Sequence, residues 1–259
     1  MNRLFGASIR FLPIRSDVIP KPFASSWKRL PGLRNQVVPA HDFSGMKQAV
    51  ITGGSGFLGQ AVAAALESPG WKIIKPSRNE MDVRDETAVR SFFSRQPVDL
   101  LVCAAGIVRD ALLTRMTDES WDEVFNVNFT GAAACARAVL PRMMEKGEGH
   151  IIFISSYSAL HPPAGQAAYA TAKAALLGLT RDLARSHGAS SIRVNVILPG
   201  FLETRMTEEV TAKRRGEVLA EHVLHRFNTP ETVGKFIRHL HHDLPHTSGQ
   251  VFQLDSRIS

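Results

Sequence analysis

After residue 45 the chain alternates short, unbroken apolar runs with segments of helical periodicity, and this alternation limits its fold more than any other feature. The apolar runs are KQAVITGG (47–54), WKIIKPS (71–77), VDLLVCAAG (98–106), HIIFISS (150–156), IRVNVILPG (192–200) and GQVFQLD (249–255). The helical segments between them are residues 57–68, 86–97, 117–147 and 167–188. Strands that show no polar alternation are buried on both faces, as in a parallel sheet. We therefore predict an α/β fold with a single doubly wound parallel sheet and helices on both faces.

Residues 1–45 show no such pattern, and we predict a disordered, basic and proline-rich N-terminal extension ahead of one folded domain at 46–259. The extension contains five prolines and carries seven Lys or Arg but only two Asp, so it holds five of the seven net positive charges. A nucleic-acid-binding domain would carry its basic face on the folded part, so we expect no nucleic-acid partner. The arginines and serines also allow a mitochondrial transit peptide, and Met46 is an alternative start. We expect a cytoplasmic protein, with the mitochondrial matrix as the alternative.

Composition excludes several further classes of protein. No apolar run approaches the roughly 20 residues of a membrane-spanning helix, so we expect no membrane partner. The two cysteines, Cys103 and Cys135, lie in apolar surroundings and are typical of reduced, buried residues. The segment RHLHHDLPH (238–246) holds four histidines but is polar throughout, and we expect no metal site there.

A glycine-rich loop, TGGSGFLG (52–59), lies between the first strand and the first helix. Gly53 allows a tight turn, Gly56 lets the backbone approach a pyrophosphate, and Gly59 allows close packing of the helix. The helix N-terminus then faces the phosphate charge. This context predicts a Rossmann-type dinucleotide site, with cofactor contacts from Gly53, Ser55, Gly56, Phe57, Leu58 and Gly59.

The end of the second strand indicates which dinucleotide is bound. An NAD site usually has an acid about 20 residues after the glycines, but Ser77 and Arg78 occupy that place and no carboxylate follows until Glu80. Because arginine pairs with phosphate, the sequence favours NADP (NADPH) over NAD. Asp82, next to Val83, is placed to accept hydrogen bonds from an adenine amino group.

The motif YATAK (169–173) contains a tyrosine and a lysine four residues apart, which places them on one face of a helix. A neighbouring ammonium group lowers the pKa of a phenol from its usual value of about 10. Reduction of a ketone by hydride leaves an alkoxide that needs a proton, so Tyr169 is a candidate acid and Lys173 its partner.

These features together resemble the short-chain dehydrogenase/reductase family over residues 46–259. The matching motifs are the glycine loop, DV (82–83), CAAG (103–106), NVN (126–128), ISS (154–156), YxxxK and LPGFLET (198–204). The resemblance implies a catalytic tetrad of Asn128, Ser156, Tyr169 and Lys173, with Lys173 also binding the nicotinamide ribose. It further implies cofactor contacts from Ala104, Ala105, Gly106, Tyr169, Lys173, Pro199, Gly200, Leu202 and Thr204.

Within the tetrad each side chain has an expected task. Ser156 follows a strand and can donate to the carbonyl oxygen as charge develops there. Asn128 interrupts a helix and can hold a water that returns protons through Lys173. The residues after 199 are expected to close on the nicotinamide amide, in part through the Thr204 hydroxyl.

The sequence is most similar to the 3-oxoacyl thioester reductases of this family. We therefore expect an NADP-dependent enzyme that reduces a 3-oxoacyl thioester, or a related ketone, to the hydroxy compound. A carbonyl, secondary-alcohol or nucleotide-sugar reductase of the same family is an alternative, because the TGxxGxxG spacing is that of sugar-nucleotide enzymes. A non-catalytic NADP-binding sensor or scaffold is the alternative from another class.

Partners are less well defined by the sequence. Reductases that use acyl carrier protein usually have arginines where this chain has Gly147 and Ser190, which weakens that prediction, although Arg142, Lys146 and Arg185 are possible substitutes. The small residues of 131–138 and 173–179 permit close helix packing, and the family resemblance implies a homo-tetramer or dimer. The C-terminal end, GQVFQLDSRIS, differs from the family's usual ending and is expected to change one wall of the site.

Overall fold

A computed structural model of the protein describes residues 45–258, and these carry a six-stranded parallel sheet. The strands lie in the order β2-β1-β3-β4-β5-β6. Their bounds are β1 Lys47–Thr52, β2 Trp71–Ile74, β3 Leu100–Cys103, β4 Gly149–Ile154, β5 Ile192–Leu198 and β6 Val251–Gln253. Each predicted apolar run overlaps one strand, so the predicted parallel sheet is confirmed. The predicted extension, except for Gly45, lies outside the described residues.

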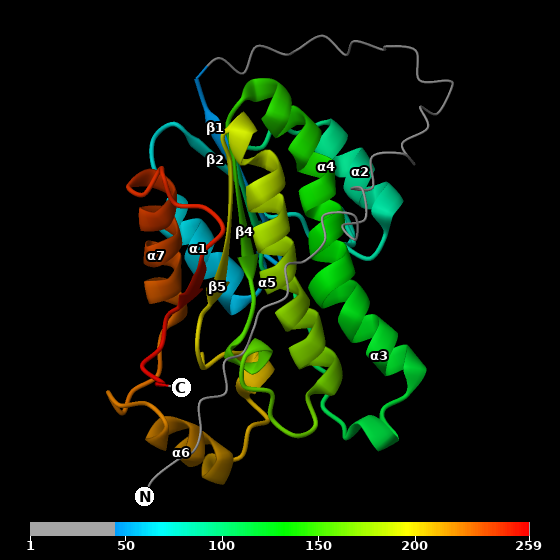
Figure 1. The fold of residues 1–259 in the computed structure, drawn as a ribbon, viewed down its shortest axis with the longest axis vertical. Coiled ribbons are helices and arrows are strands. Elements are labelled where there is room, and N and C mark those ends of the chain that lie inside the picture. The colour runs from blue at the N-terminus through cyan, green and yellow to red at the C-terminus, as the bar shows by residue number, and fades with distance from the viewer. Residues whose placement is uncertain (1–44, 259) are drawn as a thin grey trace, which may run out of the picture. The chain divides into compact units, whose positions relative to one another are not determined.

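Helices cover both faces of the sheet. They are α1 Phe57–Leu66, α2 Glu86–Ser94, α3 Asp118–Phe125, α4 Gly131–Lys146, α5 Ala167–His187, α6 Ala212–Ala220 and α7 Pro230–His242. In Figure 1, α2, α4 and α5 lie on one side of the sheet, whereas α1 and α7 lie on the other. This arrangement is the predicted doubly wound fold.

Two apolar clusters explain why the helices settle on these faces. One cluster lies between the sheet and the helices α2, α4 and α5, and its buried members include Phe93, Met143 and Leu176. The other joins the opposite side chains to α1 and α7. Because successive strand residues point to opposite faces, unbroken apolar runs supply both clusters at once.

The segment predicted as one long helix at 117–147 is three elements. It begins at the predicted N-cap Thr117, whose hydroxyl accepts a hydrogen bond from the Ser120 N–H at 3.2 Å. After α3 comes a π-helical turn, Asn126–Thr130, before α4. A π turn widens the helix by one residue and is often found at functional sites.

Helix α7 was not predicted, and the view that residues 238–246 are polar throughout is wrong. Leu240 is fully buried and His241 is 9% exposed. Val233, Ile237 and Leu240 pack on the second cluster at helical spacing, so the histidines between them occupy a helix whose inner face is apolar.

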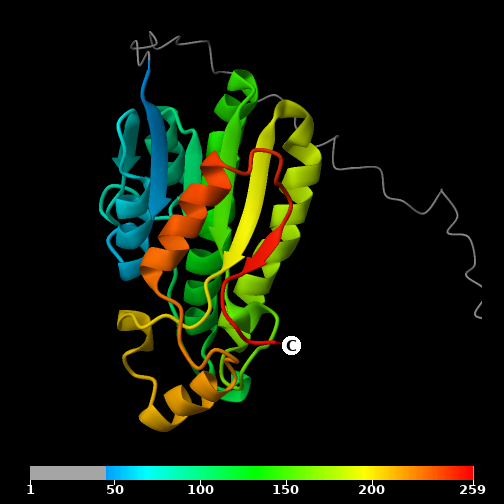
Figure 2. The ribbon, with the colours of Figure 1, turned by 90° about the vertical axis from the view of Figure 1, so that its left-hand side faces the viewer.

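All six strands point the same way, so the loops that follow them gather at one edge. Figure 2 shows the arrowheads of the central strands directed toward the end of the molecule where α6 lies. Both cysteines are buried and free, as expected. In the described part of the chain, no helix is long and apolar enough to cross a membrane.

Candidate active site

The glycine loop joins β1 to α1 with little space for side chains. Gly53 has φ +66°, and a Cβ on it would lie 2.7 Å from the Cα of Ala105. A Cβ on Gly59 would lie 2.6 Å from the Cα of Gly54, so α1 packs closely on the loop. Gly56 is the N-cap of α1 and offers no side-chain cap, and the first turn contains no acid. The first N–H groups of α1 are therefore left for an anionic ligand.

The remaining residues of the predicted cofactor crevice line the neighbouring strand ends. Thr52 closes β1, and its hydroxyl accepts the N–H of Ala105 at 3.2 Å, which joins the ends of β1 and β3. Phe57 is 55% exposed beside the loop. Leu202 is buried in the core, so only its backbone is available to a cofactor. Val83 packs against Gly131, where a Cβ would lie 2.9 Å from the Val83 side chain.

The residues expected to select the cofactor form one turn after β2. Oε2 of Glu80 accepts hydrogen bonds from the N–H and hydroxyl of Ser77 at 2.8 and 2.7 Å. The exposed Arg78 donates its Nε–H to Asp82 at 3.2 Å. Asp82 also accepts hydrogen bonds from the backbone and guanidinium of Arg84 at 2.7–3.1 Å. This pairing competes with the bond to an adenine amino group that we expected of Asp82.

Lys75 is a residue of this region that the sequence reading missed. Its side-chain stem lies over the glycine loop, since a Cβ on Gly54 would lie 2.7 Å from the Cβ and Cγ of Lys75. The ammonium group has no hydrogen bond or ion pair within the described residues. The sequence feature that could have identified Lys75 is its position directly after β2.

Tyr169 and Ser156 meet where β4 ends and α5 begins. The pKa of Tyr169 is raised from its usual value because burial disfavours the phenolate, and the nearby Ser156 side chain acts in the opposite direction. The predicted lowering by Lys173 is therefore not found. The reason is geometric: the Lys173 ammonium lies 5.7 Å from the centre of the Tyr169 ring and donates to the carbonyl of Ile154 at 2.8 Å.

Lys173 is held at both its backbone and its side chain by the end of β4. The Ser155 hydroxyl donates to the Lys173 carbonyl at 2.8 Å, and Lys173 Nζ donates to Ile154. The lysine is 4% exposed, and burial lowers its pKa to about 8. A lysine with that pKa exchanges its proton close to neutral pH, which suits a proton relay.

Asn128 lies in the π-helical turn and is 1% exposed. Its amide nitrogen donates to the carbonyls of Ile107 and Val124, both at 2.8 Å, which fixes the orientation of the group. Its Oδ1 has no hydrogen-bond donor among the described residues. A Cβ on Gly106 would lie 2.8 Å from this oxygen and 3.5 Å from Lys173 Nζ. Asn128 and Lys173 therefore border the same small space beside Gly106.

The loop after β5 lies at the same edge of the sheet, because all the strands are parallel. The Thr204 N–H donates to the Thr207 hydroxyl at 3.0 Å, which forms a short 3-10 turn at Arg205–Thr207. Asn228 donates to the carbonyls of Pro199 and Leu254 at 2.9 and 2.8 Å. The loop is thus fixed to the C-terminal segment.

A polar chain that the sequence reading also missed joins the loops after β3 and β4. The Ser158 hydroxyl donates to Gln166 at 3.0 Å, and Gln166 donates to Asp110 at 3.0 Å. Asp110 also contributes to the raised pKa of Tyr169. These contacts hold the start of α5, and with it Tyr169, against both loops.

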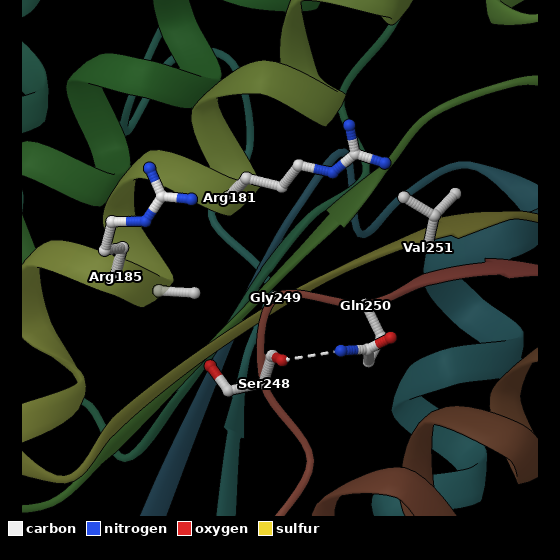
Figure 3. Close-up of a pocket in the computed structure, with 7 residues that line it drawn as sticks. Arg181, Arg185, Ser248, Gly249, Gln250 and Val251 are labelled. Atoms are coloured by element: carbon white, nitrogen blue, oxygen red, sulfur yellow. Dashed lines mark hydrogen bonds between the residues drawn. The ribbon is translucent and has the colours of Figure 1, made fainter. Parts of the chain in front are cut away.

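A separate concave region of about 650 Å³ lies against α5 and the start of β6. Figure 3 shows the two arginine heads from α5 directed apart, with Ser248 and Gln250 on the opposite wall. It adjoins the start of β6, whereas the residues described above follow the strand ends, so it is not part of the candidate site. No group of three or more His, Cys, Asp or Glu in residues 45–258 is arranged to hold a metal ion.

Comparison with known proteins identifies the family of this chain. A family model described as "Enoyl-(Acyl carrier protein) reductase" matches residues 55–256. The 3-oxoacyl-[acyl-carrier-protein] reductase of Escherichia coli is 35% identical over 198 residues, which cover 68% of this chain and 81% of that protein. The enzyme of the same name from Thermotoga maritima is 41% identical over 162 residues, which cover 62% of this chain and 66% of that protein.

A solved structure is also similar. It is described as a putative NAD(P) dependent gluconate 5-dehydrogenase from Beutenbergia cavernae with bound NADP at low occupancy. The TM-score is 0.76 at 26% identity, and the match covers 81% of this chain and 95% of that one. The family model matches most of this chain's length, and a relative is 35% identical to it. The chain therefore belongs to the short-chain dehydrogenase/reductase family.

Proposed function

We propose that this protein is an NADP-dependent oxidoreductase that reduces a 3-oxoacyl thioester to the 3-hydroxyacyl thioester. The observation that carries the proposal is the meeting of Tyr169, Ser156, Lys173 and Asn128 at the strand ends beside the glycine loop. The names of the relatives from Escherichia coli and Thermotoga maritima support the substrate class.

The residues present fit a dinucleotide. The uncapped N-terminus of α1 and the glycine cradle suit a pyrophosphate, because any side chain at Gly53 or Gly59 would fill the space. Lys75, Ser77 and Arg78 offer positive charge and donors for the 2′-phosphate that distinguishes NADP. When bound, the nicotinamide supplies the hydride.

The protein's own groups then handle the oxygen of the substrate. Ser156 donates a hydrogen bond to the carbonyl oxygen, and Tyr169 gives it a proton. The raised pKa keeps the phenol protonated at neutral pH, so the acid is present in its active form. The Lys173 ammonium lies 5.7 Å from the centre of the Tyr169 ring and carries its proton at neutral pH, and the free Oδ1 of Asn128 can hold a water that returns a proton to Lys173.

Exposed apolar side chains on the loops at this edge of the sheet suit an acyl chain. Large apolar side chains that are 44–62% exposed lie on the loops after three adjacent strands, at the edge where the candidate site lies. They are Leu112, Leu113, Leu160, Met206, Val223 and Leu224. Exposed apolar groups gathered at a site mark a surface for an apolar ligand. A nucleotide sugar or a small polyol would gain little from them.

The carrier of the acyl group is part of the proposal. Lys146, one suggested substitute for the usual carrier-binding arginines, is ion-paired with Asp99 and lies 3.5 Å from Glu148. Arg142 and Arg185 have no such partner within residues 45–258. We place coenzyme A thioesters ahead of acyl carrier protein, because the basic docking residues are few.

A homo-oligomer through α4 and α5 is also proposed. Nothing described lies within 4 Å of a Cβ built on Gly178, so the small residues of α5 present an open face for close helix packing. Sedimentation of the purified protein would show a dimer or tetramer; a monomer at micromolar concentration would contradict this.

The test is NADPH oxidation by the purified protein with acetoacetyl-CoA, acetoacetyl-acyl carrier protein, simple ketones and a panel of nucleotide sugars. We expect the highest kcat/KM on a thioester. Turnover of only the nucleotide sugars would favour the function suggested by the TGxxGxxG spacing. NADPH binding without turnover of any substrate would favour a sensor or scaffold and overturn the proposed activity.

A further inference from the structure

The donors best placed to hold a 2′-phosphate are already engaged by carboxylates of the same turn. Glu80 Oε2 accepts both the N–H and the hydroxyl of Ser77, at 2.8 and 2.7 Å. Asp82 accepts the Nε–H of Arg78 at 3.2 Å. A backbone N–H, a hydroxyl and a guanidinium are the groups with which proteins bind phosphate oxygens.

Two donors that converge on one oxygen form a site for an anion, and here that anion is Glu80. Both hydrogen bonds lower the pKa of the Glu80 carboxyl, so the group is ionised at neutral pH. Its oxygen stands where a phosphate oxygen bonded to Ser77 would stand. Glu80 is three residues beyond the position at which an acid would be expected to bind the ribose of NAD.

We propose that Glu80 is a specificity-determining residue. It occupies the Ser77 donors and thereby reduces the preference of the enzyme for NADP over NAD. The inference rests on the proposed use of a nicotinamide dinucleotide. A 2′-phosphate must displace the carboxylate and then remain beside it, and like charges repel. A 2′-hydroxyl meets no such conflict, because it can donate a hydrogen bond to Glu80.

The Glu80 side chain is not needed to form the turn. The backbone N–H groups of Glu80 and Met81 both donate to the Ser77 carbonyl, at 3.1 and 3.0 Å. Glu80 is also exposed. Substitution of the side chain therefore leaves the turn and the fold in place, and a change in ligand preference is open to direct measurement.

The experiment compares two fragments that differ only in the 2′-phosphate. Adenosine 2′,5′-bisphosphate and adenosine 5′-monophosphate are titrated by calorimetry into the full-length protein and the variants Glu80→Ala and Glu80→Gln. Glu67→Gln removes an equal charge from the exposed end of α1, remote from Ser77, and serves as the matched control.

We expect the ratio of affinities, bisphosphate over monophosphate, to rise about fivefold or more in Glu80→Ala, as expected for freed donors and a lost like charge. The rise in Glu80→Gln is smaller, because glutamine keeps an acceptor on Ser77, and Glu67→Gln leaves the ratio unchanged. Ratios within about twofold of the wild-type value in both Glu80 variants would overturn the inference.

The result is independent of catalysis and of which cofactor the wild-type protein prefers. A shifted ratio in a protein that turns over no thioester would refute the proposed substrate and support the role of Glu80. Thioester turnover with an unshifted ratio would support the proposed substrate and refute the role of Glu80. Absence of binding by both fragments in every variant would overturn the inference together with the dinucleotide site.

Discussion

The guanidinium of Arg257 lies 3.4 Å from the centre of the Tyr157 ring, and Tyr157 directly follows Ser156. Arg257 is held by Asp255, to which its Nε and Nη2 donate at 2.7 and 2.5 Å. Asp255 in turn packs on Gly200, where a Cβ would lie 2.6 Å from the aspartate Cβ. The C-terminal segment therefore links the loop after β5 to the residue beside Ser156.

Loss of the Tyr157 ring is expected to disturb Ser156. Tyr157→Leu removes the contacts with Arg257 and with His161, which stacks on the ring at 4.4 Å. A cation–π contact contributes about 0.5–2 kcal/mol, so kcat/KM for reduction should fall roughly 3- to 30-fold while NADPH affinity holds. Tyr157→Phe keeps the ring and serves as the control. Equal activity of the two variants would show that the ring does not position Ser156.

Tyr169→Phe removes the proposed acid and leaves the ring in place. We expect kcat to fall at least about a hundredfold, as for other general acids, with NADPH affinity nearly unchanged. Steady-state reduction of acetoacetyl-CoA and fluorescence titration with NADPH measure the two effects. A variant that retained substantial turnover would exclude Tyr169 as the proton donor.

The pH dependence of reduction should report Lys173. Its pKa is lowered to about 8 by burial, so the ammonium is present below that pH and is lost above it. Because the pKa of Tyr169 is raised, the phenol stays protonated through the same range. We expect kcat/KM to fall about tenfold per pH unit above pH 8. Lys173→Arg keeps the charge and should give a lower, flat profile; a flat wild-type profile would contradict the role.

The sheet was predictable because burial on both faces leaves unbroken apolar runs in the sequence. Helix α7 was missed although Val233, Ile237 and Leu240 have helical spacing, since the intervening histidines made the segment look polar. The break in the helix at Asn128 was anticipated from one polar residue. The π-helical geometry that turns its amide toward Gly106 depends on packing against α5, which the sequence does not display.

The proximity of the four residues of the candidate tetrad was also predictable, but their electrostatics were not. Four-residue spacing places Tyr169 and Lys173 on one helix face whatever surrounds them. The pKa of Tyr169 depends on burial and on Asp110, which is distant in sequence. The hydrogen bonds from Ser77 to Glu80 span only three residues, but they could be recognised only once the geometry of the turn was known.

Gly106→Ala should block the space between Asn128 and Lys173. The added methyl would lie 2.8 Å from Asn128 Oδ1, closer than side chains tolerate. We expect kcat to fall by about tenfold or more, because a water at Asn128 could no longer return a proton to Lys173. The loss of NADPH affinity should be smaller. Rapid-mixing measurement of the first turnover separates hydride transfer from later steps. An unchanged kcat would show that this space plays no part in the reaction.

Two buried histidines should make the fold sensitive to acid. His150 and His241 contact each other through their Nδ1 atoms at 3.1 Å, with Arg193 nearby. Burial lowers the pKa of His241 to about 3 and that of His150 well below 6.5. The folded state therefore keeps both rings neutral while the unfolded chain takes up protons below its own pKa of about 6.5. The free energy of unfolding must fall as the pH falls through that value.

Each such histidine contributes a slope of about 1.4 kcal/mol per pH unit below the unfolded pKa. Urea unfolding at a series of pH values between about 7 and 5, above the range in which carboxylates titrate, measures it. His241→Gln keeps a polar partner for His150 and should remove one histidine's share of the slope. His239→Gln, at an exposed position on the same helix, serves as the control. Equal slopes in both variants would mean that His241 takes up its proton without unfolding, so the buried cluster would have to open locally in acid.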